Sequence, residues 1–213
     1  MRFARQGELG LTRSEFAVLR RLSTPEKIQD FLNAIPANFE IGGQTCLSVR
    51  EVLSRRRAHC IEGAMLAACA LWVHGEPPLL LDLEAERDYD HVVTLFRRGG
   101  FWGAISKTSP PVLRWRDPVY RNLRELAISY LHEYANKRGQ KTLRSYAGPF
   151  DLRKIDPKVW VTNGKNCWQV GDALNELRHV PLITRRQSRK LRLRDPVERK
   201  AGALSEPRRP GRR

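Results

Sequence analysis

Residues 57–72 read RAHCIEGAMLAACALW, a run in which small and apolar side chains occupy nearly every position after Ile61. A helix that is apolar on all sides is buried, so this run predicts a central, tightly packed helix. Cys60 stands where that helix begins. The first amides of a helix are unpaired donors with positive partial charge, which stabilise a thiolate or an oxyanion. The pattern therefore predicts that Cys60 is a nucleophile.

The pattern changes from helix to strand after this run. Residues 79–83 are a short apolar run that predicts a buried strand. Residues 91–96 are β-branched and aromatic and predict a second strand, which begins at His91. Residues 97–100 predict a hairpin turn, and residues 101–106 return as the partner strand. The imidazole of His91 is the predicted general base and acid for the thiol.

The hairpin predicts a third member of the site. A turn centred between Arg98 and Gly99 places Ser106 opposite His91, and opposed side chains lie about 5 Å apart at the β-carbon. A bulge would move this position by one residue, to Ile105 or Lys107. Ser106 is therefore predicted to orient the imidazole.

Three of these runs resemble the transglutaminase-like superfamily: RAHCIEGA at 57–64, YDHVV at 89–93 and WGAISKT at 102–108. The resemblance extends over residues 45–110. In that family a cysteine opens a buried helix, a histidine begins a strand, and an aspartate follows on the next strand in a setting like W-x-x-x-D-x-T. The resemblance implies a papain-like α+β fold, with the helix opened by Cys60 packed on an antiparallel sheet. The family contains acyl transferases, peptidases, amidases and inactive members.

The chain departs from the family pattern at the aspartate position, where Ser106 stands. Serine accepts a hydrogen bond from imidazole but supplies no charge to stabilise imidazolium. Other side chains also have a candidate role. The carboxylate that replaces the aspartate could come from Asp88, Asp90 or Asp117. His59 and Glu62 flank the thiol and could tune it, and the amide of Gln44 could bind the oxyanion. Cys69, nine residues after Cys60, is predicted to be a core residue.

Outside this region the patterns predict structure without chemistry. We expect an N-terminal segment of two short helices over 1–36, a transglutaminase-like domain over 37–183 and a disordered basic tail over 184–213. Within the domain, a long helix is predicted from 117 to 139, a strand at 159–161 and a short helix near 172–177.

Composition limits the class of protein. The net charge is +16, and residues 184–213 hold 12 of the 39 Lys and Arg residues, with only 3 Asp and Glu. Weak contact of this tail with nucleic acid, through phosphate neutralisation, is one interpretation. The four cysteines form no C-x-x-C pair, which predicts a reduced, cytoplasmic protein without a disulfide scaffold or a metal site. No apolar run approaches membrane-spanning length.

The sequence thus favours cysteine-dependent acyl transfer on a peptide or carboxamide, with Cys60, His91 and Ser106 as the site and no cofactor. Hydrolysis would make the protein a thiol peptidase or amidase, and amine capture would make it a transglutaminase. Two alternatives stay open. One is an inactive transglutaminase-like interaction module, which the serine at the aspartate position supports. The other is a basic nucleic-acid-binding protein. The oligomeric state is left open.

Overall fold

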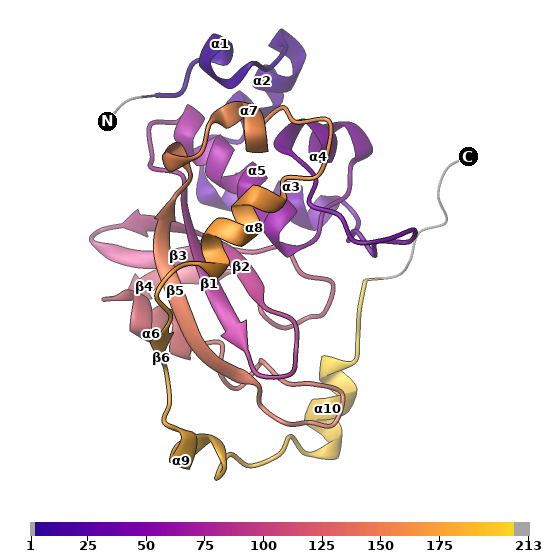
Figure 1. Cartoon of the computed structure of the whole chain (residues 1–213), viewed down its shortest axis with the longest axis vertical. Helices are drawn as coiled ribbons and strands as arrows, with labels where there is room; N and C mark the ends of the chain where they lie inside the picture. The colour runs from indigo at the N-terminus through magenta and orange to yellow at the C-terminus, as the bar shows by residue number, and fades with distance from the viewer. Residues whose placement is uncertain (1–2, 207–213) are drawn as a thin grey trace.

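A computed structural model of the chain describes residues 3–206. A six-stranded antiparallel sheet, with strand order β4-β3-β2-β1-β5-β6, forms its centre (Figure 1). The strands are β1 Leu79–Ala85, β2 His91–Arg98, β3 Phe101–Ile105, β4 Arg116–Tyr120, β5 Leu143–Asp151 and β6 Val180–Pro181. The helices of the described part are α1 Gln6–Leu9, α2 Arg13–Arg21, α3 Pro25–Ala34, α4 Val49–Arg55, α5 Cys60–Val73, α6 Leu123–Ile128, α7 Pro157–Trp160, α8 Trp168–Asn175, α9 Arg185–Ser188 and α10 Pro196–Gly202. The expected α+β class with an antiparallel sheet is confirmed.

Helix α5 begins at Cys60, as predicted, and packs on β2. It is buried along most of its length, because its alanines let the neighbouring elements approach closely. The hydroxyl of Thr94 on β2 donates to the carbonyl of Ala64 at 2.7 Å and fixes helix and strand together. A side chain at Gly63 would bring its Cβ to 2.5 Å from Cβ of Lys107, so this position requires glycine. The start of α5 is therefore held rigidly over the sheet.

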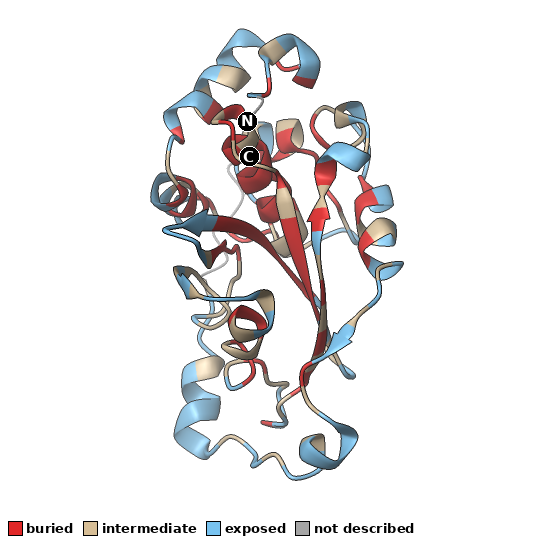
Figure 2. Ribbon diagram, turned by 90° about the vertical axis from the view of Figure 1, so that its left-hand side faces the viewer, coloured by how far each residue is buried: buried red, intermediate tan, exposed pale blue. Residues whose placement is uncertain are grey.

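The sheet separates two hydrophobic clusters, because successive side chains of a strand point to opposite faces (Figure 2). Val92 and Phe96 of β2 belong to the cluster around α5. Val93 and Leu95 of the same strand belong to the cluster around α6. Both faces of the sheet are thus covered, and the catalytic candidates lie at one end of it.

The described part of the expected N-terminal segment, residues 3–36, contributes to the core. Ile28 and Leu32 of α3 are fully buried in the cluster around α5, together with Leu19 of α2. The short α1 precedes the two helices that were predicted. This segment therefore supports the site from the same core that α5 occupies.

Two expectations for the middle of the chain are wrong, and one strand was not predicted. The predicted helix at 117–139 is instead the edge strand β4, which tolerates Pro118, followed by the short α6, which Asn122 caps at 2.9 Å. The predicted strand at 159–161 is α7 with its following residue, because Asp156 caps the helix and Pro157 stands at its first position. Strand β5, which pairs with β1, lies where no element was predicted. The helix expected near 172–177 is present as α8.

The described part of the C-terminal segment, residues 184–206, has a defined conformation, in contrast to the expected disordered tail. It forms α9 and α10 at the end of the molecule opposite α1 and α2 (Figure 1). The Arg194 guanidinium donates to the carbonyl of His132 at 3.0 Å and to that of Glu133, and its amide donates to the carbonyl of Gly139 at 2.9 Å. The remainder of the expected tail, 207–213, lies outside the described residues. Within the described residues, none of the helices is both long enough and apolar enough to cross a bilayer.

Candidate active site

The Cys60 thiol lines a cavity of about 320 Å³ between the start of α5 and the ends of β2 and β3. His59, His91, Lys107 and Tyr134 line the same cavity. The other three cysteines are fully buried, and burial raises the pKa of their thiols. Cys60 is thus the one thiol of the four that combines access to a cavity with acidic character. The prediction that Cys69 is a core residue is confirmed.

The second member, His91, is buried at the first position of β2 and is held by Ser106. The Ser106 hydroxyl lies 2.8 Å from Nε2 of His91 and donates its proton to the carbonyl of Leu113 at 2.6 Å. Because a hydroxyl has a single proton, Ser106 accepts from His91, and Nε2 carries the hydrogen. Nδ1 is then the nitrogen that remains to exchange a proton with the thiol.

The contact between His91 and Ser106 arises from a different register than the one predicted. Gly99 and Gly100 form the two-residue turn, since both take positive φ, as a primed hairpin turn requires. Arg98 therefore pairs with Phe101, two residues away from the expected register. A register shift of two residues keeps every side chain on the same face of the sheet. His91 and Ser106 therefore still share a face, as diagonal neighbours in place of directly opposed ones.

A second imidazole, that of His59, flanks the thiol. Nδ1 of His59 lies 3.9 Å from Sγ of Cys60. Its Nε2 lies 2.8 Å from the carbonyl of Thr45 and 3.2 Å from a carboxylate oxygen of Glu62. The ring therefore connects the thiol to a buried negative charge. The sequence predicts His59 and Glu62 only as groups that tune the thiol, whereas in the structure the thiol, the His59 ring and the Glu62 carboxylate form one chain of contacts.

The Glu62 carboxylate is completely buried and surrounded by donors. It accepts from the amides of Leu47 and His59, both at 2.9 Å, from the Thr45 hydroxyl at 2.7 Å and from Asn38 Nδ2 at 3.0 Å. Burial alone would raise its pKa, but the hydrogen bond and charge of His59, with those of the other donors, lower the pKa to about 2. The same pairing, together with the thiol, raises the pKa of His59 against the effect of burial.

These two imidazoles make the thiol acidic. Burial would raise the pKa of the Cys60 thiol, but the interaction with the two imidazoles, that of His59 at 3.9 Å and that of His91, outweighs burial and lowers the pKa to about 5. A lowered pKa of the thiol and a raised pKa of His59 both favour a thiolate at Cys60 beside an imidazolium at neutral pH. Because it is the first residue of α5, the positive end of the helix adds to this stabilisation.

Gln29 of α3 is a positioning residue that the sequence analysis missed. Its side chain donates to the carbonyl of Ser106 at 2.8 Å and accepts from the amide of Ser106 at 2.9 Å. The two residues are 77 positions apart, so no local pattern links them. This amide clamp fixes the backbone of the residue that orients His91.

The other candidates have different partners. Asp88 and Asp90 line the cavity, but Asp88 accepts from Thr142 and Asp90 from the amide of Ala85, both at 2.8 Å. Asp117 accepts from the indole of Trp115 at 2.8 Å. Within the described residues, the carboxylates that reach an imidazole of the site do so at Nε2 of His59: that of Glu62 at 3.2 Å and that of Glu40 at 3.7 Å. Gln44 is not part of the lining of the cavity.

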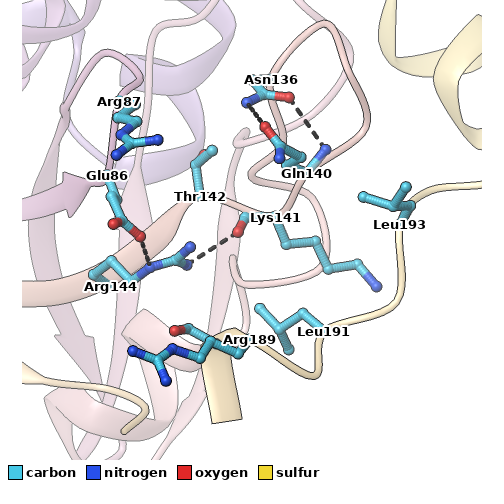
Figure 3. A pocket seen from close by; sticks show the side chains of 11 residues that line it. Glu86, Arg87, Asn136, Gln140, Lys141, Thr142, Arg144, Arg189, Leu191 and Leu193 are labelled. Atoms are coloured by element: carbon cyan, nitrogen blue, oxygen red, sulfur yellow. Dashed lines mark hydrogen bonds and ion pairs between the residues drawn. The ribbon is translucent and has the colours of Figure 1, made fainter. Parts of the chain in front are cut away.

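A second cavity, of about 290 Å³, lies between the loop before β5 and the C-terminal segment (Figure 3). Arg144 pairs with Glu86 across it at 2.7 Å, and Leu191 and Leu193 of the C-terminal segment line its other side. Its lining contains neither a thiol nor an imidazole. The chemistry therefore lies at Cys60, while this second cavity marks where the C-terminal segment docks.

A scan against models of known protein families finds none that matches the chain, and a search of curated proteins finds no match. Among residues 3–206, no group of three His, Cys, Asp or Glu side chains is arranged to hold a metal ion.

Proposed function

We propose that the protein catalyses acyl transfer from a peptide or carboxamide through a thioester on Cys60. The observation that carries the proposal is a thiol of lowered pKa between two imidazoles, each of which has its own buried partner. An imidazole that is held by a second hydrogen bond is the usual sign of an activated nucleophile. The intact pairing of both rings favours an active enzyme over an inactive interaction module.

In the acylation step, the Cys60 thiolate attacks the carbonyl carbon, and the C–N bond breaks as the tetrahedral intermediate collapses. We assign stabilisation of the oxyanion to the start of α5, because the first amides of a helix lie at its positive end and have no partner within the helix. Imidazolium gives its proton to the departing amine, which leaves as a neutral molecule. We assign this transfer to His91, because Nδ1 is its free nitrogen, and we assign charge stabilisation to His59 with Glu62.

In the second step, neutral imidazole accepts a proton from water or from an amine as that nucleophile attacks the thioester. The C–S bond breaks, the thiolate is restored, and the acid or the new amide leaves. Water makes the protein a peptidase or amidase, and an amine makes it a transglutaminase. The cysteine-opened helix on an antiparallel sheet also supports the proposal that the fold is the transglutaminase-like, papain-like one.

Reaction with the activated ester p-nitrophenyl acetate at pH 6 tests this function. At that pH lysine side chains are protonated and do not compete, whereas Cys60 is a thiolate. We expect one acetyl group per chain, located at Cys60 by peptide mapping, and its release as acetate on longer incubation. Acetylation at other positions, or an unmodified Cys60, would contradict the proposed function. The Cys60→Ala variant provides the blank.

A further inference from the structure

Lys107 carries a buried positive charge in the wall of the same cavity. Its side chain is 1% exposed, and it crosses α5 at Gly63, one turn from Cys60. Its Nζ donates to the carbonyl of Ile35 at 2.8 Å. A buried charge without a counter-charge destabilises a protein strongly, so this ammonium requires an anion.

The anion is the carboxylate of Glu206, the last residue that the structure describes. Nζ of Lys107 lies 2.9 Å and 3.2 Å from its two oxygens. The amide of Ala37 donates to the same carboxylate at 2.8 Å, and the Arg114 guanidinium lies 3.6 Å from it. Two cations and a main-chain donor therefore converge on one carboxylate, which is a complete recognition site for an acidic side chain.

Glu206 enters this site in the manner of a bound peptide. Its main-chain amide donates to the carbonyl of Ser109 at 3.1 Å, while its side chain reaches Lys107. Ser109, Lys107 and Ala37 all line the cavity that contains Cys60. Main-chain hydrogen bonds combined with one side-chain pocket are the usual means by which a protein binds an extended peptide.

The segment that carries Glu206 has little hydrophobic packing against the rest of the chain. Helix α10 immediately before it buries none of its residues, so no hydrophobic packing holds the helix in place. The Glu206 side chain itself remains 20% exposed. A tethered ligand of this kind competes at the effective concentration that its linker sets, which a peptide in solution can match.

We propose that Lys107, Arg114 and the Ala37 amide form a subsite for an acidic side chain of a peptide substrate, and that Glu206 occupies it in cis. This inference rests on the proposed acyl transfer and adds the substrate class: a peptide with a glutamate near the reacting carbonyl. The C-terminal segment then acts as a built-in competitor for that substrate.

The subsite is tested by binding, without any need for turnover. The probe is a fluorescent peptide, amidated at its C-terminus, with the sequence of residues 202–208, GALSEPR, beside its analogue GALSQPR. The protein is the full chain with Glu206→Ala in a Cys60→Ala background. A hydrogen-bonded charge pair contributes about 1.5–3 kcal/mol, so we expect the glutamate peptide to bind at least about tenfold more tightly. The chain that retains Glu206 should bind this peptide more weakly.

Matched variants determine which side chains bind the glutamate carboxylate of the peptide. Adding Lys107→Met should abolish the preference for glutamate, and the milder Arg114→Gln should reduce it in a chain whose core is untouched. Glu176→Ala, which removes an exposed carboxylate at the end of α8 and outside the lining of the cavity, should leave peptide binding unchanged. Equal binding of the two peptides overturns the proposal. So does tighter binding of GALSQPR than of GALSEPR. Because Cys60 is absent, these results stand apart from the fate of the acyl-transfer proposal.

Discussion

Replacing His91 with alanine is expected to lower the steady-state release of p-nitrophenol from p-nitrophenyl acetate by about 10²–10⁴-fold, the usual contribution of a general acid–base group. The loss follows because His91 is the ring whose Nδ1 is free to move a proton at the thiol, while Nε2 is held by Ser106. The effect should fall mainly on hydrolysis of the acetyl-enzyme, which needs a base for water.

Ser106→Ala tests how much of this effect is positioning. It removes one neutral hydrogen bond, worth about 1 kcal/mol, so turnover should fall by roughly tenfold or less. His132→Ala is the matched control, since His132 is exposed on the surface and outside the lining of the cavity. Turnover of the His91 variant within a factor of three of the unmodified chain would remove His91 from the mechanism.

Glu62→Gln is expected to give the largest loss of stability. The new amide has nearly the same shape, but its NH₂ group would face the His59 amide and the Asn38 side chain, both of which are donors. Removing one partner of a buried charged network costs about 3–5 kcal/mol. For a chain of this length that lowers the melting temperature by on the order of 10 °C.

The pH dependence of that loss has a definite sign. The pKa of Glu62 is lowered to about 2 in the folded protein, so the carboxylate contributes stability above its ordinary pKa, and that stability disappears as pH falls toward 2. The difference in melting temperature between the two chains should hold from pH 8 to about 4.5 and shrink below it. Glu176→Gln, an exposed counterpart, should melt like the unmodified chain. A Glu62→Gln variant that melts within 2 °C of it would show that this network does not support the fold.

The core of the site was predictable because its signals are local. The small, apolar run of α5 fixes a buried helix, and Cys60 is its first residue. The β-branched run from His91 fixes β2. The family resemblance connected these elements, and the hairpin placed Ser106 on the face of His91 even though the register was two residues off.

The remainder depends on contacts between distant parts of the chain. Strand β5 contains Gly148 and Pro149, which obscure its alternation, and it becomes a strand by pairing with β1. The donors around Glu62 come from the loop that includes Asn38 and Thr45, so its role cannot be read from the helix alone.

The conformation of the C-terminal segment likewise depends on contacts with distant residues. Its composition is typical of a disordered tail, yet two of its residues make contacts with the rest of the chain: Arg194 with the turns after α6, and Glu206 with Lys107. Single ion pairs and main-chain hydrogen bonds leave no periodic pattern in a sequence. The expected weak contact with nucleic acid through this segment stays a prediction.

The central claim, a thiolate at Cys60 stabilised by two imidazoles, is tested most directly by the pH profile of its reaction with 2,2′-dithiodipyridine. With a pKa of about 5, the rate should be half-maximal near pH 5 and flat from pH 6 to 8. At pH 6 an ordinary thiol is less than 1% ionised. A thiolate of low pKa is a weaker nucleophile than an ordinary thiolate, and with this effect included Cys60 should react on the order of tenfold faster than an ordinary thiol. The unfolded chain supplies the ordinary thiols for comparison. A rate that climbs tenfold per pH unit between 6 and 8, like that of the unfolded chain, would contradict the account.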